Sequence, residues 1–353
     1  MNMTDHQMTI LGRCPMDGGA LWLTFPLSGV AFSLKNASFL RFRLRADMTA
    51  ENPDFPVQKA RYAVYINGGK ATDALMMTKR ANLEYRDLNP EETYEIRLLK
   101  LSECTQSLMA IEDLETDGTT EKIEEKPFRI EFIGDSITCG YGVEGLCGEE
   151  TFSTATENAE KGYAALTARA LNADAQLNSY SGFGIVSGYT GDPAVRAADI
   201  LVPMFYEKTG LNSYRLPSGK CLQETEWDFS GFEPQVVVIN LGTNDLSWCQ
   251  NDPERKDFFR REYAKFLKTV RKRRSGARIL CVLGVMGTGL NEAMTAAVKD
   301  YRMETGDPLI RSLALEEQDQ EKDGVGSDFH PSAITQKKLA EKVTTEIQSW
   351  LRN

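Results

Sequence analysis

The most informative part of the sequence is residues 128–142, which read Phe-Arg-Ile-Glu-Phe-Ile-Gly-Asp-Ser-Ile-Thr-Cys-Gly-Tyr-Gly. Its apolar alternation stops at Gly134-Asp135-Ser136, and glycines follow at positions 140 and 142. This pattern predicts a buried strand that delivers a serine onto a tight turn, where glycines let the backbone approach a ligand closely. The chain has only two histidines, so few groups are available as a base for this serine.

Strand-like and helix-like patterns alternate from this stretch to the end of the chain. The run 236–241 is continuously apolar and rich in β-branched residues, which is typical of a central parallel strand covered on both faces. Apolar residues at helical spacing follow at 256–274, then a strand pattern at 279–285 and a last helix pattern near 333–351. This order predicts a three-layer α/β domain with right-handed crossovers.

The N-terminal part of the chain has a different pattern. Short alternating apolar runs are separated by turn residues such as Asn67-Gly68-Gly69, and no convincing helix intervenes. Such strands predict a small antiparallel β-sandwich. The segment 115–127 is polar and charged and ends in proline, which favours a domain boundary there. We therefore expect a β-sandwich over residues 1–120 and the α/β domain over residues 121–353.

Composition limits the class of partner. The net charge of −10 argues against nucleic acid or an anionic membrane, and the basic run 271–274 fits a helix C-terminus. The first residues lack the pattern of a signal peptide, and no apolar window is long enough for a transmembrane helix. The seven cysteines are scattered without a CxxC pair, so we expect a cytoplasmic protein with reduced thiols. We expect no metal, because cysteines and histidines never cluster at ligand spacing.

Polar segments follow several of the predicted strands, and a further one precedes the last helix. In a parallel sheet these segments meet at the carboxyl ends of the strands, where ligands bind. Each motif alone is also compatible with plain turn or helix-cap chemistry. The segments are Gly134-Asp135-Ser136, Ser181-Gly182-Phe183-Gly184, Gly242-Thr243-Asn244-Asp245 and Ser327-Asp328-Phe329-His330-Pro331.

Together these segments can supply the parts of an acyl-transfer site. A serine is a poor nucleophile until a base takes its proton, and His330 is the credible base because His6 lies near the N-terminus. The transition state also needs donors for an oxyanion. The backbone N–H groups of Ser136 and Gly182 and the side-chain amide of Asn244 are candidates, whereas an ionised Asp245 cannot donate.

The blocks Gly-Asp-Ser, Gly, Gly-x-Asn-Asp and His-Pro, in this order, resemble the SGNH (or GDSL) hydrolase superfamily. The longer strings 130–142, 238–245 and 327–332, with a preceding β domain, are similar to carbohydrate esterase family 2. The resemblance implies a flavodoxin-like three-layer α/β/α domain preceded by a jelly roll. It also implies Ser136 as nucleophile, His330 as general base, an oxyanion hole completed by Gly182 and Asn244, and no cofactor.

The third member of a catalytic triad departs from the position that the superfamily commonly uses. The superfamily commonly places Asp three residues before the histidine, where this chain has Ser327. In an extended loop the spacing of Asp328 puts its carboxylate on the face of His330, so Asp328 is expected to orient the imidazole. The alternative is a Ser–His dyad, since a backbone carbonyl substitutes in some members of the family. Trp248 is an expected aromatic wall for a pyranose ring, and partial burial as a packing residue is the equal alternative.

The expected function is removal of O-acetyl groups from acetylated oligosaccharides derived from xylan or mannan, through an acetyl-enzyme. One alternative is a lipase or thioesterase of the same fold, which would need a long apolar acyl channel. Another is a carbohydrate-binding protein whose β domain recognises glycans and whose esterase site is vestigial. The glycan backbone, the hydroxyl position and the formation of a homo-oligomer are left open by the sequence.

Overall fold

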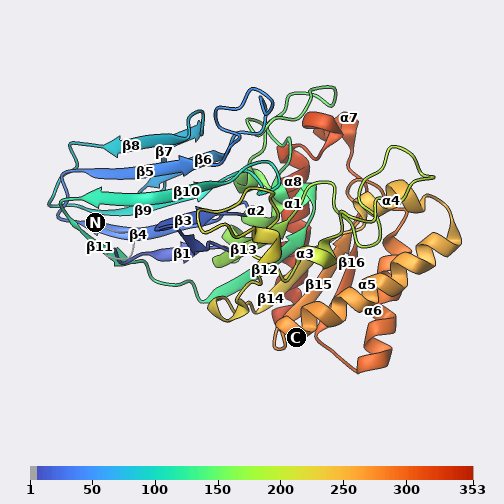
Figure 1. Ribbon diagram of the computed structural model, residues 1–353. Helices are drawn as coiled ribbons and strands as arrows, with labels where there is room; N and C mark the ends of the chain where they lie inside the picture. The colour runs from blue at the N-terminus through green and yellow to red at the C-terminus, as the bar shows by residue number, and fades with distance from the viewer. Residues whose placement is uncertain (1–5, 353) are drawn as a thin grey trace. The chain divides into compact units, whose positions relative to one another are not determined.

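The computed structural model describes residues 6–352, and these divide into two compact units. The first unit consists of the described chain up to Glu125 together with Ser153–Asn158 and Lys208–Trp227. The second unit consists of Lys126–Phe152, Ala159–Glu207 and the described chain from Asp228 onward. Figure 1 shows strands dominating the N-terminal part and helices alternating with strands in the C-terminal part.

The first unit contains two antiparallel sheets. One has the order β1-β4-β9-β6-β7, with β11 also paired to β4: Thr9–Leu11, Gly29–Lys35, Thr93–Lys100, Arg61–Ile66, Gly69–Leu75 and Thr119–Lys122. The other has the order β2-β3-β10-β5-β8: Met16–Asp17, Ala20–Leu23, Met109–Thr116, Leu40–Ala46 and Arg80–Tyr85. Apolar side chains from both sheets form one buried cluster.

Strand β5 illustrates how the sequence pattern forms this cluster. Its apolar residues Leu40, Phe42 and Leu44 are fully buried, each adding about 1.5–3 kcal/mol of hydrophobic stabilisation. The intervening Arg41 and Arg43 lie on the opposite face and pair with acidic side chains of neighbouring strands. The alternation that the sequence predicts is therefore that of a sheet with one buried face.

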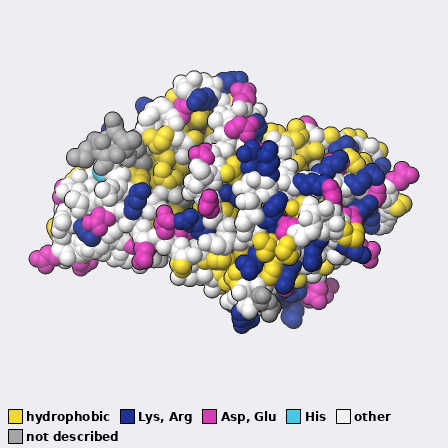
Figure 2. All heavy atoms as spheres, turned by 90° about the horizontal axis from the view of Figure 1, so that it is seen from below, with side chains coloured by type: hydrophobic (Ala, Val, Ile, Leu, Met, Phe, Trp, Pro, Cys, Tyr) yellow, Lys and Arg dark blue, Asp and Glu magenta, His cyan; other side chains and the backbone are white. Residues whose placement is uncertain are grey.

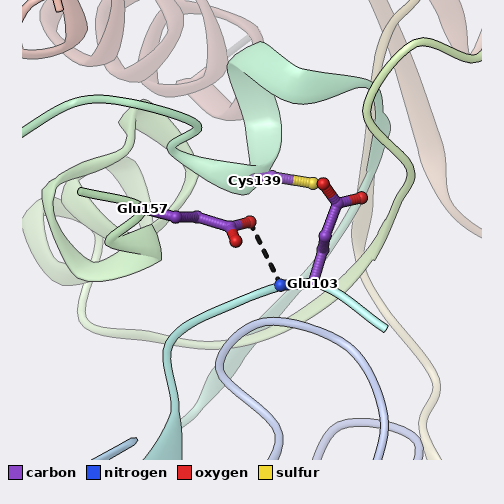
Figure 3. A group of neighbouring side chains, drawn as sticks. All are labelled: Glu103, Cys139 and Glu157. Atoms are coloured by element: carbon purple, nitrogen blue, oxygen red, sulfur yellow. Dashed lines mark hydrogen bonds between the residues drawn. The ribbon is translucent and has the colours of Figure 1, made fainter. Parts of the chain in front are cut away.

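Segment Ser153–Asn158 joins the first unit through polar contacts. The Arg61 guanidinium donates to the carbonyl oxygens of Ala155 at 2.8 Å and Glu157 at 3.2 Å. The Glu103 N–H donates to the Glu157 carboxylate at 3.1 Å (Figure 3). Burial, with the nearby Glu103 charge, raises the pKa of Glu157 well above its usual range. These contacts join residues far apart in the sequence, so no local sequence pattern predicts that this segment belongs to the first unit.

The second unit is built on a parallel five-stranded sheet in the order β13-β12-β14-β15-β16. The strands are Ala173–Ser179, Phe128–Gly134, Val236–Asn240, Arg278–Leu283 and Ile310–Ala314. Helices α2 and α8 pack together, as do α5 and α6, and Figure 1 shows helices on both faces of this sheet. The longer helices are α2 (Tyr163–Ala170), α5 (Pro253–Arg273), α6 (Asn291–Thr305) and α8 (Ala333–Arg352); the short ones are α1 (Ser136–Cys139), α3 (Val202–Phe205), α4 (Thr243–Cys249) and α7 (Gln320–Asp323). The α/β prediction is confirmed.

One ion pair is buried in this unit. Glu131, in the middle of strand β12, accepts from the guanidinium of Arg274 at 2.6 Å, and both side chains are almost fully buried. The other arginines of the predicted basic run end helix α5, where Arg271 pairs with Asp307 and Arg273 pairs with Glu207. The basic run is thus neutralised locally, and Figure 2 shows charges of both signs interspersed on the face that it displays. None of the helices in the described part of the chain is long and apolar enough to cross a membrane.

Candidate active site

Ser136 lies where strand β12 passes into the short helix α1. Asp135 caps this helix by accepting from the Ile137 N–H at 3.1 Å, and Ser136 is its first, buried residue. Gly134 is required just before the turn, because a Cβ there would stand 2.0 Å from the Thr138 hydroxyl oxygen. Close packing at the end of the strand therefore fixes the direction in which the serine is presented.

His330 reaches this serine from the loop that precedes helix α8. Its Nε2 lies 2.8 Å from the Ser136 Oγ, and its Nδ1 lies 3.1 Å from the backbone carbonyl oxygen of Asp328. A carbonyl oxygen only accepts hydrogen bonds, so Nδ1 carries the proton and Nε2 is free to accept from the serine hydroxyl. Burial lowers the pKa of His330 to about 4, against the opposing effect of the Asp328 carbonyl, so the imidazole is neutral at neutral pH.

The Asp328 carboxylate differs from the expectation. It does not bind the imidazole; its Oδ2 accepts from the Tyr141 hydroxyl at 2.8 Å and the Phe152 N–H at 3.3 Å. The expected extended loop is wrong, because residues 327–329 form a 3₁₀ turn in which Asp328 has φ 50° and Phe329 has φ 58°. The left-handed backbone turns the carbonyl, and not the carboxylate, toward His330, at a cost of about 1–2 kcal/mol per residue.

The expected oxyanion donors come from neighbouring segments. Asn244, in the first turn of α4, donates through Nδ2 to the Phe183 carbonyl at 2.8 Å, and the same nitrogen lies 3.5 Å from the Asp135 carboxylate. Phe183 directly follows Gly182, and Asp135 directly precedes Ser136. These bonds bring the three donor-bearing segments together. Gly182 has φ 83°, a conformation that glycine adopts without strain.

Asp245 has a role that the sequence interpretation missed. Its buried carboxylate accepts from the N–H groups of Ile185 (2.9 Å), Val186 (2.6 Å) and Ser187 (3.0 Å), so it fixes the turn that follows Gly182. Burial raises the pKa of Asp245 to about 6, while these three N–H groups act in the opposite direction. Asp245 directly follows Asn244 in the sequence, but it was considered there only as a hydrogen-bond donor, a role that an ionised carboxylate cannot fill.

Tyr141 is a second residue that sequence reasoning did not single out. Its ring stacks on Phe152 with centroids 3.8 Å apart, and the His330 ring centroid lies 4.2 Å away. The signal was present, because Tyr141 lies inside the quoted stretch 128–142. Its side chain thus contacts the imidazole face as well as the Asp328 carboxylate.

Trp248 lies in helix α4 and is half-buried. The guanidinium of Arg255 lies 4.8 Å from a centroid of its ring system, and that of Arg196 lies 5.6 Å away. Phe258 meets the indole edge to face at 6.4 Å. Protein groups therefore already engage much of this indole.

Comparisons with known proteins identify a family for the chain and several similar proteins. The sequence profile of the GDSL-like Lipase/Acylhydrolase family matches residues 132–338. The chain is 40% identical over 229 residues to the cellulase/esterase CelE of Acetivibrio thermocellus, covering 63% of this chain and 26% of that protein. It is 30% identical over 269 residues to an acetylxylan esterase / glucomannan deacetylase of Cellvibrio japonicus, covering 72% and 69% of the two chains.

A solved structure is similar over almost the whole chain. It is a family two carbohydrate esterase from Clostridium thermocellum in complex with cellohexaose, with a TM-score of 0.82 and 29% identity. The similarity covers 98% of this chain and 99% of that one. The chain spans about a quarter of the length of CelE, so that protein has further parts with no counterpart in this sequence.

Proposed function

The chain belongs to the GDSL-like lipase/acylhydrolase family, and we propose that it is a serine esterase that removes O-acetyl groups from oligosaccharides. The observation that carries the proposal is the 2.8 Å contact between the Ser136 Oγ and a His330 Nε2 left free to accept by the bond at Nδ1. This is the arrangement of an activated nucleophile and its base. The names of the relatives, acetylxylan esterase / glucomannan deacetylase and cellulase/esterase, support acetylated xylan- or mannan-type glycans as the substrate class.

The reaction follows from the protons at these atoms. The Ser136 Oγ attacks the acetyl carbonyl while the His330 Nε2 takes the hydroxyl proton. The N–H groups of Ser136 and Gly182 and the Asn244 amide stabilise the resulting oxyanion. The intermediate collapses to an acetyl ester of Ser136, and His330 returns its proton to the departing sugar hydroxyl. Water, deprotonated by the same Nε2, then attacks the ester, and acetate leaves as Ser136 regains its proton.

Four further assignments are part of the proposal. The two antiparallel sheets of the first unit form a jelly roll, which is supported by the single apolar cluster that they share. The protein works in a reducing compartment such as the cytoplasm, which is supported by its seven free cysteines, six of them buried. Asp328 orients His330 through its carbonyl, and Trp248 borders the sugar.

The test is release of acetate from acetylated xylo- and manno-oligosaccharides, with NMR to identify the hydroxyl that is freed. Ser136→Ala should reduce the rate by about 10⁴-fold or more. Ser275→Ala, on an exposed turn, is the matched control and should keep the wild-type rate. Preference for an aryl octanoate over the acetate would favour a lipase instead. Glycan binding without any ester hydrolysis would favour the vestigial site.

A further inference from the structure

The His330 loop has a conformation that its own residues do not prefer. Asp328 and Phe329 are consecutive non-glycine residues with positive φ, and the surrounding structure must hold them there. The position of the Asp328 carbonyl, and hence the tautomer of His330, depends on this conformation. The groups that hold Asp328 therefore bear directly on the base of the reaction.

Three bonds hold Asp328, and all come from the segment 141–152. The Asp328 N–H donates to the Glu150 carbonyl at 3.1 Å, and its carboxylate accepts from the Phe152 N–H at 3.3 Å. The third bond, from the Tyr141 hydroxyl at 2.8 Å, is the shortest, and it is the one of the three whose partner group on the segment 141–152 is a side chain. Both bonds to the carboxylate are charge-assisted, and the one from Tyr141, at 2.8 Å, is shorter than the one from Phe152, at 3.3 Å, so it is the strongest of the three.

Tyr141 is itself tied to the nucleophile. Its N–H donates to the Ser136 carbonyl at 3.1 Å, immediately after helix α1 ends at Gly140. Its ring stacks on that of Phe152 with centroids 3.8 Å apart, and the His330 ring, tilted by 36°, has its centroid 4.2 Å away. The Tyr141 side chain thus contacts both the imidazole of His330 and the Asp328 carboxylate. Its backbone N–H binds the turn that carries Ser136.

We propose that Tyr141 is a positioning residue: its hydroxyl holds the Asp328 carboxylate away from His330, so that the Asp328 carbonyl binds Nδ1. Without that hydroxyl the carboxylate loses its strongest partner and is free to turn toward the imidazole, or the loop relaxes and admits water. Either change favours the imidazolium, so the pKa of His330 rises. The role of Tyr141 in the rate rests on the proposed esterase function, whereas its effect on the imidazole does not.

The first test reads the imidazole directly by NMR. The chain has two histidines, so a His6→Gln background leaves His330 as the one histidine signal. In this background the ¹⁵N spectrum should show the Nδ1–H tautomer, with the titration of His330 at low pH. Adding Tyr141→Phe, which keeps the ring, should raise the titration midpoint by about one unit or more. An unchanged midpoint and tautomer would overturn the proposal.

The second test uses kinetics on an aryl acetate. Tyr141→Phe should lower kcat about 10- to 100-fold with KM within about twofold, because misplacing a catalytic group costs rate and not ground-state binding. Asp328→Asn should lower kcat similarly, and the double variant should be no worse than the poorer single variant, since both act through one bond. Tyr301→Phe is the matched control. Tyr301 lies in helix α6, and its hydroxyl also donates to a carboxylate, that of Asp307, at 3.3 Å.

The outcomes separate the two proposals. A wild-type protein that hydrolyses no ester contradicts the proposed function, and the NMR titration still decides the role of Tyr141. An active wild type with an unaffected Tyr141→Phe variant contradicts the positioning role alone. Strictly additive losses in Tyr141→Phe and Asp328→Asn would also contradict it, because they would mean that the two residues act independently.

Discussion

Replacing Asp245 by alanine should separate the positioning of the Gly182 turn from the chemistry at Ser136. The carboxylate accepts three buried N–H groups, from Ile185, Val186 and Ser187, and alanine leaves all three without their acceptor. Each unpaired buried donor costs about 1–3 kcal/mol, which sets an upper bound of about 9 kcal/mol.

Two effects reduce this bound. Water can enter the space that the carboxylate leaves, and removing a desolvated carboxyl returns part of the free energy that its burial costs. Burial raises the pKa of Asp245 to about 6, which is about two units above its ordinary 3.8 and corresponds to about 3 kcal/mol at neutral pH. We therefore expect Asp245→Ala to lower the free energy of unfolding in urea by about 2–4 kcal/mol.

The effect on catalysis is expected to be of similar size to the effect on folding. The turn that presents the Gly182 N–H loses its anchor, and loss of one oxyanion donor typically lowers kcat by about 10²–10³-fold. Asp245→Asn keeps one oxygen acceptor, so its kcat should fall by only about 10-fold. Asp257→Ala, on the exposed face of helix α5, serves as the control for loss of a carboxylate. A folded Asp245→Ala variant with the wild-type kcat on an aryl acetate would refute the reasoning.

Four further predictions concern pH and packing. Burial lowers the pKa of His330 to about 4, so kcat/KM should rise as pH passes through about 4 and stay level to neutrality; a limb near 6.5 would contradict it. Between about pH 4 and 6.5 the unfolded state binds a proton at His330 and the folded state does not, so this histidine makes the free energy of unfolding rise with pH. In the His330→Gln variant, the free energy of unfolding in urea should lack this rise. Arg274→Met removes the one cation paired with the buried Glu131 carboxylate among the ion pairs described and should lower the free energy of unfolding in urea by about 3–5 kcal/mol; a loss below about 1 kcal/mol would show that the pair is dispensable. Gly134→Ala places a Cβ 2.0 Å from a threonine hydroxyl and should lower the Tm, whereas Gly276→Ala, with open space around it, should not.

Much of the second unit could be predicted from sequence, because its signals are local. The apolar run at 236–241 and the amphipathic pattern at 256–274 correspond to β14 and α5, whose bounds are Val236–Asn240 and Pro253–Arg273. The resemblance to SGNH hydrolases and carbohydrate esterase family 2 is confirmed by the family match and the similar structures. The contact between Ser136 and His330 was foreseeable because the chain offers so few histidines.

What could not be predicted depends on contacts between distant residues. The local sequence does not require positive φ at Asp328 and Phe329, since the bonds that hold this conformation come from residues 141–152. In an extended chain, side chains two positions apart point to the same side, and on this basis the Asp328 carboxylate was expected to face the His330 imidazole. The loop is not extended, so this expectation is wrong. Asp245 was misjudged for a similar reason, because its three donors lie about 60 positions away in the sequence and only folding reveals them.

The discontinuity of the first unit constrains how the chain is made. Its last segment ends at Trp227, so a ribosome working at about 5–20 residues per second needs more than ten seconds to deliver the whole unit. A nascent chain that stops at Glu125 lacks the carbonyl partners of the Arg61 guanidinium, which is otherwise buried. All strands of its two sheets are translated by Lys122, but the buried contacts made by Ser153–Asn158 and Lys208–Trp227 form only later. We therefore expect that dividing the chain at any single peptide bond will not yield two parts that each contain one complete unit.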